Sequence, residues 1–425
     1  MNASHLRHLA PALLLLTLSL PAAEPESAEL VAIRKLVAEA KHKLGDRAGL
    51  PEVEDKFLAI PRNGRWMTPV EAREAIDRAP AKLEKLRWWK PGLDPSKLTH
   101  ALREPAAVIG WGVNVHRAGA DKNGRSLALA REAGDFLIWA QGEAGTGGFP
   151  FPAVRGDTHD KAFAAAERYL AAAEKAGRLD AVVHRGWTVD DAGDGGLQFD
   201  NGEAGFAQLE LYRATKDQRY LASARRAADW AALRPLARNW NYNSFSVHLL
   251  AAMFVETHDT RYLAAAKHKV IVGVIPGQLT DGPRAGRWLD PHNARPTYHY
   301  IMMRALASLA AALPKDDPER PEIVRALKLG LQARNREILG PGAPTKDKAM
   351  EALVMVRHLF ADDPEFLRDS LSLQALDALG KLVSEQWRRG GDPLGPREWG
   401  MFLNLVIAPP APTATKSSPA KSNAP

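Results

Sequence analysis

The sequence predicts an all-α protein in which helical hairpins close into a double-layered α/α toroid, and three observations support this fold class. Sustained alternation of apolar and β-branched residues is almost absent, so strand signals are scarce. Alanine-rich segments with helical periodicity fill the chain instead, and breaks rich in Gly, Pro and Asp separate them. An internal repeat joins these segments in pairs, as stacked helical hairpins require.

The expected helices follow one another along nearly the whole chain. In order, they cover residues 28–44, 69–88, 101–116, 124–141, 158–176, 203–214, 218–233, 244–257, 260–274, 296–313, 321–337, 347–361 and 365–388. Such a number of segments predicts five or six hairpins.

The repeat has a period of 42 residues. TKDQRYLASA (215–224) and THDTRYLAAA (257–266) match at seven of ten positions, and the same offset relates Asn201 to Asn243. A weaker copy of the acid-aromatic-Leu pattern occurs in DDPEFL (362–367). A period of this length, made of two helices, is typical of stacked helical hairpins.

The two helices of a repeat differ in their apolar pattern. Residues 245–255 are apolar nearly all round, which predicts a helix buried on every side. Residues 218–233 instead carry an apolar stripe of Tyr220, Ala224, Ala227 and Ala231, with arginines elsewhere. Alternating buried and half-exposed helices fit an inner and an outer ring. An open α-solenoid is the competing fold, and the long loops 142–157 and 276–294 favour the toroid because they could build a cleft at one end.

The two ends of the chain differ in composition from its body. Residues 1–23 combine Arg7, a short apolar run and small residues before Ala23, which is the layout of a secretory signal peptide. Residues 408–425 are rich in Pro, Ala, Ser and Thr and are expected to form a disordered tail. The toroid is therefore expected to span residues 24–407 as a single domain, in a periplasmic or secreted monomer without a membrane span.

Composition excludes several classes of function. The formal net charge is +7, and about +4 remains without the signal peptide and the tail, which is too little to predict nucleic-acid binding. The chain has no Cys, so disulfides and thiol catalysis are excluded. It also lacks the HExxH, GxSxG and P-loop motifs.

The stretch DDAGDGGLQFDNGE (190–203) holds five carboxylates and four glycines directly before a helical segment. Acids are favoured near a helix N-terminus, but five exceed what capping requires. Asp190, Asp191, Asp194 and Asp200 offer the hard oxygen ligands that calcium takes, although their spacing is not that of an EF-hand. A calcium site is one hypothesis. The alternative is a solvated acidic loop in which Asp200 or Asn201 caps the helix.

Two further stretches resemble the pectate lyases built on an α/α toroid. These are LIWAQGEAGTGGFPFP (137–152) and FDNGEAGFAQLELYRATKDQRYLASARRAADWA (199–231), and the resemblance covers about residues 125–270. It implies calcium-assisted β-elimination of an acidic polysaccharide, with Asp200 binding metal or substrate. The chain departs from that family at two positions. Gly202 follows Asp-Asn here, whereas the family has threonine, and Ser244 stands where the family has an acid.

β-Elimination of a uronate requires a group that neutralises the carboxylate and a base that removes the C5 proton. The segment RWLDPHNARPTYHYIMMRAL (287–306) supplies candidate bases at the start of a buried helix. The resembled lyases use an arginine as base, so Arg295 is the first candidate, with His299 and Tyr298 as alternatives. Structural salt bridges and caps are the competing role for Arg295 and His299.

Aromatic residues in the loops before the inner helices could bind sugar rings, because pyranose C–H groups pack on flat aromatic faces. The expected sugar-binding residues are Trp187, Trp240, Tyr242, Trp288, Phe149 and Tyr298, together with Asn201 and Asn243. Helix capping is the competing role for Asn243, and His248 is expected in the core.

The sequence thus favours a carbohydrate-active protein that acts on an acidic polysaccharide as a pectate-lyase-like enzyme. Two alternatives stay open. A glycoside hydrolase could use Asp190 or Asp191 with Asp200 as a carboxylate pair. A toroid without catalysis could bind a glycan or a protein partner.

Overall fold

The computed structural model describes residues 27–85, 87–98, 100–154 and 161–408, with the side chains of 161–165 left out. The predicted signal peptide lies outside these residues, and so does the predicted tail apart from Ala408. The described helices are α1 (Ala28–Leu44), α2 (Pro69–Lys85), α3 (Arg103–Arg117), α4 (Arg125–Ala144), α5 (Lys161–Lys175), α6 (Leu179–Val182), α7 (Gly196–Thr215), α8 (Gln218–Leu233), α9 (Trp240–Thr257), α10 (Thr260–Gly273), α11 (Pro296–Ala312), α12 (Arg320–Leu339), α13 (Asp347–Leu359), α14 (Pro364–Asp369), α15 (Ser372–Arg388) and α16 (Pro396–Ile407).

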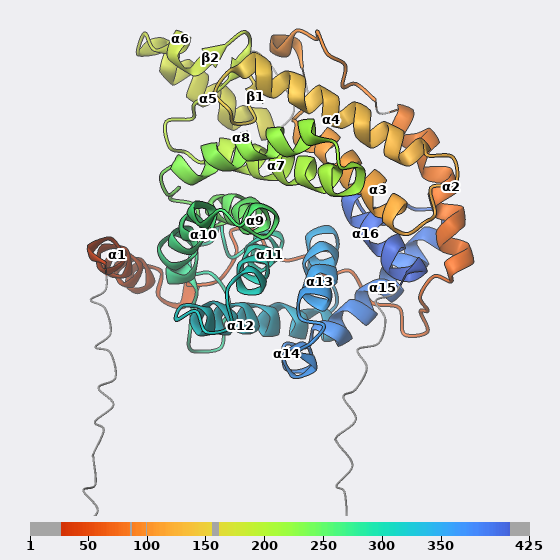
Figure 1. Cartoon of the computed structure of the whole chain (residues 1–425). Helices are drawn as coiled ribbons and strands as arrows, with labels where there is room; N and C mark the ends of the chain where they lie inside the picture. The colour runs from red at the N-terminus through yellow and green to blue at the C-terminus, as the bar shows by residue number, and fades with distance from the viewer. Residues whose placement is uncertain (1–26, 86, 99, 155–160, 409–425) are drawn as a thin grey trace, which may run out of the picture.

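Six helices form a closed inner ring, which confirms the predicted double-layered toroid (Figure 1). In order around the ring they are α3, α7, α9, α11, α13 and α16, and α16 packs back against α3. The outer layer follows the same order, since α4 packs on α3, α8 on α7, α10 on α9, α12 on α11 and α15 on α13, while α2 covers α16.

The inner and outer helices show most of the burial that their sequences predict. On α9, every residue from Phe245 to Ala251 is buried, but burial on every side does not reach the end of the predicted range, where Val255 is 52 % exposed. On α8, the stripe Tyr220, Ala224, Ala227 and Ala231 is fully buried, while Arg219 on the same helix is exposed. An apolar stripe facing the inner ring and a charged face toward solvent are what an outer-layer helix needs.

The 42-residue repeat reflects equivalent contacts in neighbouring hairpins. Asp217 and Asp259 are the N-caps of α8 and α10, and each accepts a hydrogen bond at 3.0 Å from the backbone two residues on. The following tyrosines, Tyr220 and Tyr262, donate to an aspartate of the preceding outer helix at 3.0 and 2.9 Å. The repeated letters therefore encode how each outer helix begins and how it contacts the one before it.

A small antiparallel sheet interrupts the helical pattern between α4 and α7. Its strands are β1 (Phe151–Pro152), β2 (Val183–His184) and β3 (Trp187–Thr188), with β3 in the middle. Together with α5 and α6 it forms an extension beside α4 and α8 (Figure 1). The sheet leads directly into the acidic loop before α7, so it fixes where that loop begins.

No helix of the described residues is long and apolar enough to serve as a membrane span.

The N-terminal ends of the inner helices α3, α7, α9, α11 and α13 contribute residues to one cavity, which marks the mouth of the toroid.

Candidate functional site

A cavity of about 370 Å³ opens at the mouth of the toroid. Its lining comes from the first turns of five inner helices and from the sheet and loop that precede α7. The polar lining residues are Arg103, Tyr169, Thr188, Asp191, Asp194, Asp200, Asn241, Tyr242, Thr297, Tyr298 and Lys348. A concave site with a few convergent polar groups on rigid helices is the usual form of a small-molecule site.

Asp200 is the most buried carboxylate of this lining, with 2 % of its surface exposed. Its Oδ1 lies 3.2 Å from Nε of Arg103, which begins α3. Burial raises the pKa of Asp200, the charge of Arg103 lowers it, and Glu203 raises it further, with a net upward shift. The carboxyl of Asp200 therefore keeps its proton to a higher pH than an ordinary aspartate does.

Aromatic rings form the apolar part of the cavity. Phe199 and Phe245 stack with their ring centroids 4.1 Å apart, and the guanidinium of Arg103 lies 4.1 Å from the centroid of Phe199. Tyr242 and Tyr298 line the same space. Burial, followed by the charge of Asp194, raises the pKa of Tyr242 to about 12, so its phenol is a proton donor at neutral pH.

Several buried polar atoms around the cavity have no hydrogen-bond partner among the described residues. They are Oγ1 of Thr188, Oη of Tyr169, Oδ1 of Asp200 and Nε of Arg103, of which the last two meet only as an ion pair. Buried polar atoms are nearly always hydrogen-bonded in native proteins, and exceptions call for an explanation such as a bound ligand or water. The two atoms without any polar partner, on Thr188 and Tyr169, favour a site for a polar molecule.

Beneath the cavity, the axis of the toroid holds a buried network of ion pairs. Arg304 contacts Glu203 at 3.0 Å and Glu351 at 2.6 Å. Arg397 lies 3.2 Å from Glu203, and Lys348 lies 2.9 Å from Glu351 and 3.0 Å from Glu398. Three cations and three carboxylates from α7, α11, α13 and α16 thus meet where the helices converge.

The charges of this network fix its ionisation. Burial raises the pKa of Glu351, but Arg304 and Lys348 overcome that effect and lower it to about 2. The pKa of Glu203 is lowered well below its ordinary value for the same reason. Nearby His248 has its pKa lowered by burial and then by Arg304, so it is neutral, and its Nδ1 lies 2.8 Å from Oγ of Ser308.

The carboxylates of the acidic loop do not converge on one point. Asp191 accepts three backbone hydrogen bonds, from Gly193 at 3.2 Å, Gly195 at 3.1 Å and Leu197 at 2.8 Å, so it closes the loop onto the start of α7. Asp190 pairs with Arg234 at 3.4 Å and is not part of the cavity lining. Asp194 is exposed and lines the cavity.

Calcium does not fit this arrangement. Asp200 is engaged by Arg103 and Asp191 by backbone amides, and nowhere in the described residues do three His, Cys, Asp or Glu side chains come together in a way that could hold a metal ion. The calcium site stays a prediction that the donor set does not support.

Arg295 lies at the edge of the cavity, and His299 lies behind its wall. Arg295 is the N-cap of α11, half exposed, and its Nη1 donates to Oη of Tyr298 at 3.3 Å and lies 3.5 Å from Glu52. His299 is fully buried between Trp288 and Arg334, and burial followed by the charge of Arg334 lowers its pKa well below 6.5. Neither side chain lines the cavity; Tyr298 does.

Most of the aromatic residues expected to bind sugar lie in the wall instead. Trp187 and Trp288 are fully buried, and Phe149 is 1 % exposed. Trp240, the first residue of α9, packs against Gly277. These rings come from loops that are themselves packed between helices, so proximity to an inner helix does not place them at the mouth. Tyr242 and Tyr298 do line the cavity.

Asn201 and Asn243 are structural residues. Each is fully buried; Asn201 donates to the carbonyl of Ala227 at 3.0 Å and accepts from Phe149 at 2.9 Å. Asn243 donates to Gly273 at 2.8 Å and exchanges two hydrogen bonds with Ala237. The pair therefore ties the N-terminal part of an inner helix to a backbone carbonyl of the outer helix that follows it, in both α7–α8 and α9–α10.

The residues that the sequence reasoning missed are Arg103, Tyr169, Phe199, Phe245 and Lys348. Arg103 and Lys348 stand in the first turns of the predicted helices 101–116 and 347–361. The rule that inner-helix N-termini surround one mouth could have found both of them from the sequence.

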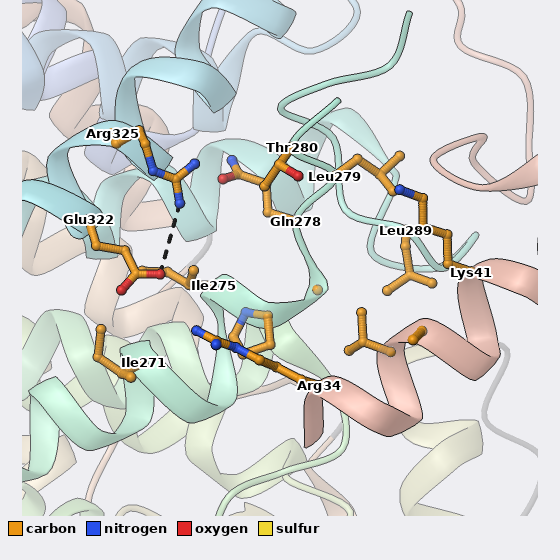
Figure 2. Close-up of a pocket in the computed structure, with 14 residues that line it drawn as sticks. Arg34, Lys41, Ile271, Ile275, Gln278, Leu279, Thr280, Leu289, Glu322 and Arg325 are labelled. Carbon is orange, nitrogen blue, oxygen red and sulfur yellow. Dashed lines mark ion pairs between the residues drawn. The ribbon is translucent and has the colours of Figure 1, made fainter. Parts of the chain in front are cut away.

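A separate cavity of about 350 Å³ lies on the outer wall, between α1, the α10–α11 connection and α12 (Figure 2). Figure 2 shows Arg34 of α1 extending toward the side of Glu322 and Arg325 of α12, which pair with each other at 3.9 Å, while Lys41 lies at the opposite side beside Leu279. None of the candidate catalytic residues from the sequence lines this space.

The chain is similar in fold to several solved structures at low sequence identity. They include a glycosyl hydrolase family 88 protein from Bacteroides vulgatus (13 % identity, TM-score 0.49, 80 % of this chain and 98 % of the other). They also include a cellobiose 2-epimerase from Spirochaeta thermophila (12 % identity, TM-score 0.45, 90 % of this chain and 98 % of the other). No protein-family model matches the chain, and no curated protein matches it.

Proposed function

We propose that the protein binds an oligosaccharide in the cavity at the mouth and hydrolyses one of its glycosidic bonds, with Asp200 as the proton donor. The observation that carries this proposal is Asp200 itself: buried, lining the cavity, raised in pKa and with Oδ1 lacking a hydrogen bond among the described residues. A general acid needs a carboxyl that holds its proton near the working pH.

Hydrolysis also needs a second carboxylate to activate water or attack the sugar. Asp194 fills that role better than Asp190 or Asp191, because it lines the cavity and keeps its side chain exposed. In the proposed reaction Asp200 gives its proton to the glycosidic oxygen as the bond to the anomeric carbon breaks. Asp194 takes a proton from the water that attacks this carbon.

The sugar rings have surfaces to pack on and partners for their hydroxyls. Tyr242 and Tyr298, which are partly exposed, supply aromatic rings, and the unpartnered atoms of Thr188 and Tyr169 supply hydrogen-bonding groups. A mixture of ring faces and directed polar atoms is the chemistry that recognises a pyranose.

β-Elimination of a uronate is the second candidate, and one observation favours it. Arg103 and Lys348 line the cavity and could neutralise a uronate carboxylate, while the phenols of Tyr242 and Tyr298 could transfer protons. Against it, three carboxylates share the lining with these two cations.

The test is to incubate the full mature chain with neutral and uronate-containing oligosaccharides while following reducing ends and the absorbance of an unsaturated uronate. Hydrolysis predicts reducing ends without that absorbance, and elimination predicts both together. Asp200→Asn should lower the rate by about a hundredfold or more, and Asp281→Asn, on the outer wall, serves as control. If no glycan is turned over or bound, the proposal is wrong.

A further inference from the structure

A second cavity of about 470 Å³ lies beside the first at the mouth. It is enclosed by the connection after α2 and by the N-terminal ends of α3, α13 and α16, and Arg103, Phe199 and Lys348 line both cavities. The two spaces therefore abut at these three side chains, next to Asp200, which pairs with Arg103.

Trp89 is the feature of this second cavity that points to a ligand. The residue is 3 % exposed and lines the cavity, and its Nε1 has no hydrogen-bond partner among the described residues. Nη1 of Arg397, in the same lining, has ion-pair contacts with Glu203 and Glu351 but no directed hydrogen bond. A buried indole N–H normally finds an acceptor, so this one fits a ligand oxygen.

The charges around the cavity select the kind of ligand. Its cations are already engaged by carboxylates: Lys348 by Glu351 and Glu398, and Arg397 by Glu203. Glu104 and Asp347 add further carboxylates to the lining. With Arg103 included, the lining holds three cations against four carboxylates, so it has no excess of positive charge for an anionic sugar. Carboxylates and an indole N–H instead suit the hydroxyls of a neutral sugar.

We infer that the second cavity is a subsite for a neutral sugar residue, on the far side of Arg103 and Asp200 from the first. The inference rests on the proposed function and adds to it the size and charge of the substrate. The protein then takes a chain of at least two sugars that spans both cavities, with the bond to be cleaved at their junction, within reach of Asp200.

Two variants probe the subsite without touching the first cavity. Trp89→Phe keeps the aromatic ring and removes only the N–H. Ala107→Leu puts a larger side chain into the second cavity, since Ala107 lines it and not the first. Trp111→Phe is the matched control, because Trp111 is 1 % exposed, also lacks a partner for Nε1, and lines neither cavity.

The experiment measures binding of neutral gluco- and manno-oligosaccharides, from the monosaccharide to the hexasaccharide, by calorimetry, to the full chain with Asp200→Asn as the common background so that the ligands stay intact. Affinity should rise with chain length, and Trp89→Phe should weaken only the longer ligands, by about three- to tenfold. Ala107→Leu should abolish the gain with length, while Trp111→Phe should leave it intact.

The outcomes separate the subsite from the proposed function. If short sugars bind but affinity does not grow with length, or if Trp89→Phe and Trp111→Phe behave alike, the subsite is wrong and the first cavity keeps its role. If only uronate oligomers gain affinity with length, the assignment to a neutral sugar is wrong. If no oligosaccharide binds, the proposed function falls together with the subsite.

Discussion

Asp200 shows how one buried carboxyl couples stability to chemistry. Its pKa is raised from 3.8, so the folded state holds this proton more tightly than the unfolded chain does. Stability is therefore lost as pH rises from 3.8 through the raised value, because ionising a buried carboxyl has a cost that the unfolded chain does not have. The same property keeps the proton available for transfer.

Asp200→Asn should remove that pH dependence. We expect the difference in unfolding free energy between the variant and the wild type to grow in favour of the variant as pH rises above 3.8, and then to level off. Denaturant unfolding at a series of pH values measures this. A constant difference across the series would mean that Arg103 fully compensates the charge.

Asn201 offers a test of the repeat at the same scale. Asn201→Ala removes two buried hydrogen bonds and leaves Phe149 N and Ala227 O without their partner. We expect a loss of about 2–4 kcal/mol in unfolding free energy, and a similar loss for Asn243→Ala. Asn123→Ala, at an exposed position, should cost less than about 0.5 kcal/mol.

The elements were predictable to the extent that their sequence patterns are local. Helices such as α8 and α10 follow the expected ranges 218–233 and 260–274 closely because caps and apolar stripes mark them. The expected start at residue 203 missed the first seven residues of α7, about two turns, because Gly195 and Gly196 look like a continuing loop. The predicted segment 365–388 is two helices, α14 and α15, broken at Leu371 with φ +59°.

The site was harder to predict because it depends on how elements pack. Trp187 and Trp288 look like exposed loop residues in the sequence, yet contacts with distant helices bury them completely. Gly202 is explained only by packing: a Cβ there would lie 2.6 Å from the carbonyl oxygen of Phe245, so α7 and α9 approach too closely for a larger residue. Neither fact is contained in local periodicity.

The acidic loop yields a prediction about metal. Because backbone amides and arginines already engage Asp190, Asp191 and Asp200, a chelator should leave the melting temperature unchanged. Asp191→Ala should lower the unfolding free energy by about 1–2 kcal/mol, since three N–H groups of the loop and of the first turn of α7 lose their acceptor. Thermal unfolding with and without calcium checks both, and stabilisation by calcium would restore the metal-site hypothesis.

For the whole molecule, the buried ion network predicts sensitivity to acid. The pKa of Glu351 is lowered from 4.5 to about 2, so its contribution is present above 4.5 and is lost as pH falls toward 2. Buried His248 stays neutral in the folded state, so the unfolding free energy also falls below pH 6.5, where the unfolded chain gains a proton on this residue and the folded chain does not. Unfolding should therefore become easier in two stages on acidification.

Glu351→Gln tests this network. The substitution leaves Arg304 and Lys348 short of a carboxylate in the core, so we expect a loss of about 3–5 kcal/mol at neutral pH and a weaker dependence on acid below 4.5. Glu74→Gln breaks the exposed pair with Arg78 and should change the unfolding free energy by less than about 1 kcal/mol. Equal effects of the two variants would contradict the role given to the network.

The closure of α16 onto α3 has a consequence for how the chain folds. The inner ring stays open until its last helix arrives, and the two helices that meet are separated by nearly the whole domain. Contacts between such distant segments form slowly, because the intervening chain must first be ordered. During synthesis, α3 must therefore wait for its neighbour with an apolar face uncovered, so chains cut short before residue 396 should aggregate or bind chaperones rather than settle into a smaller stable fold.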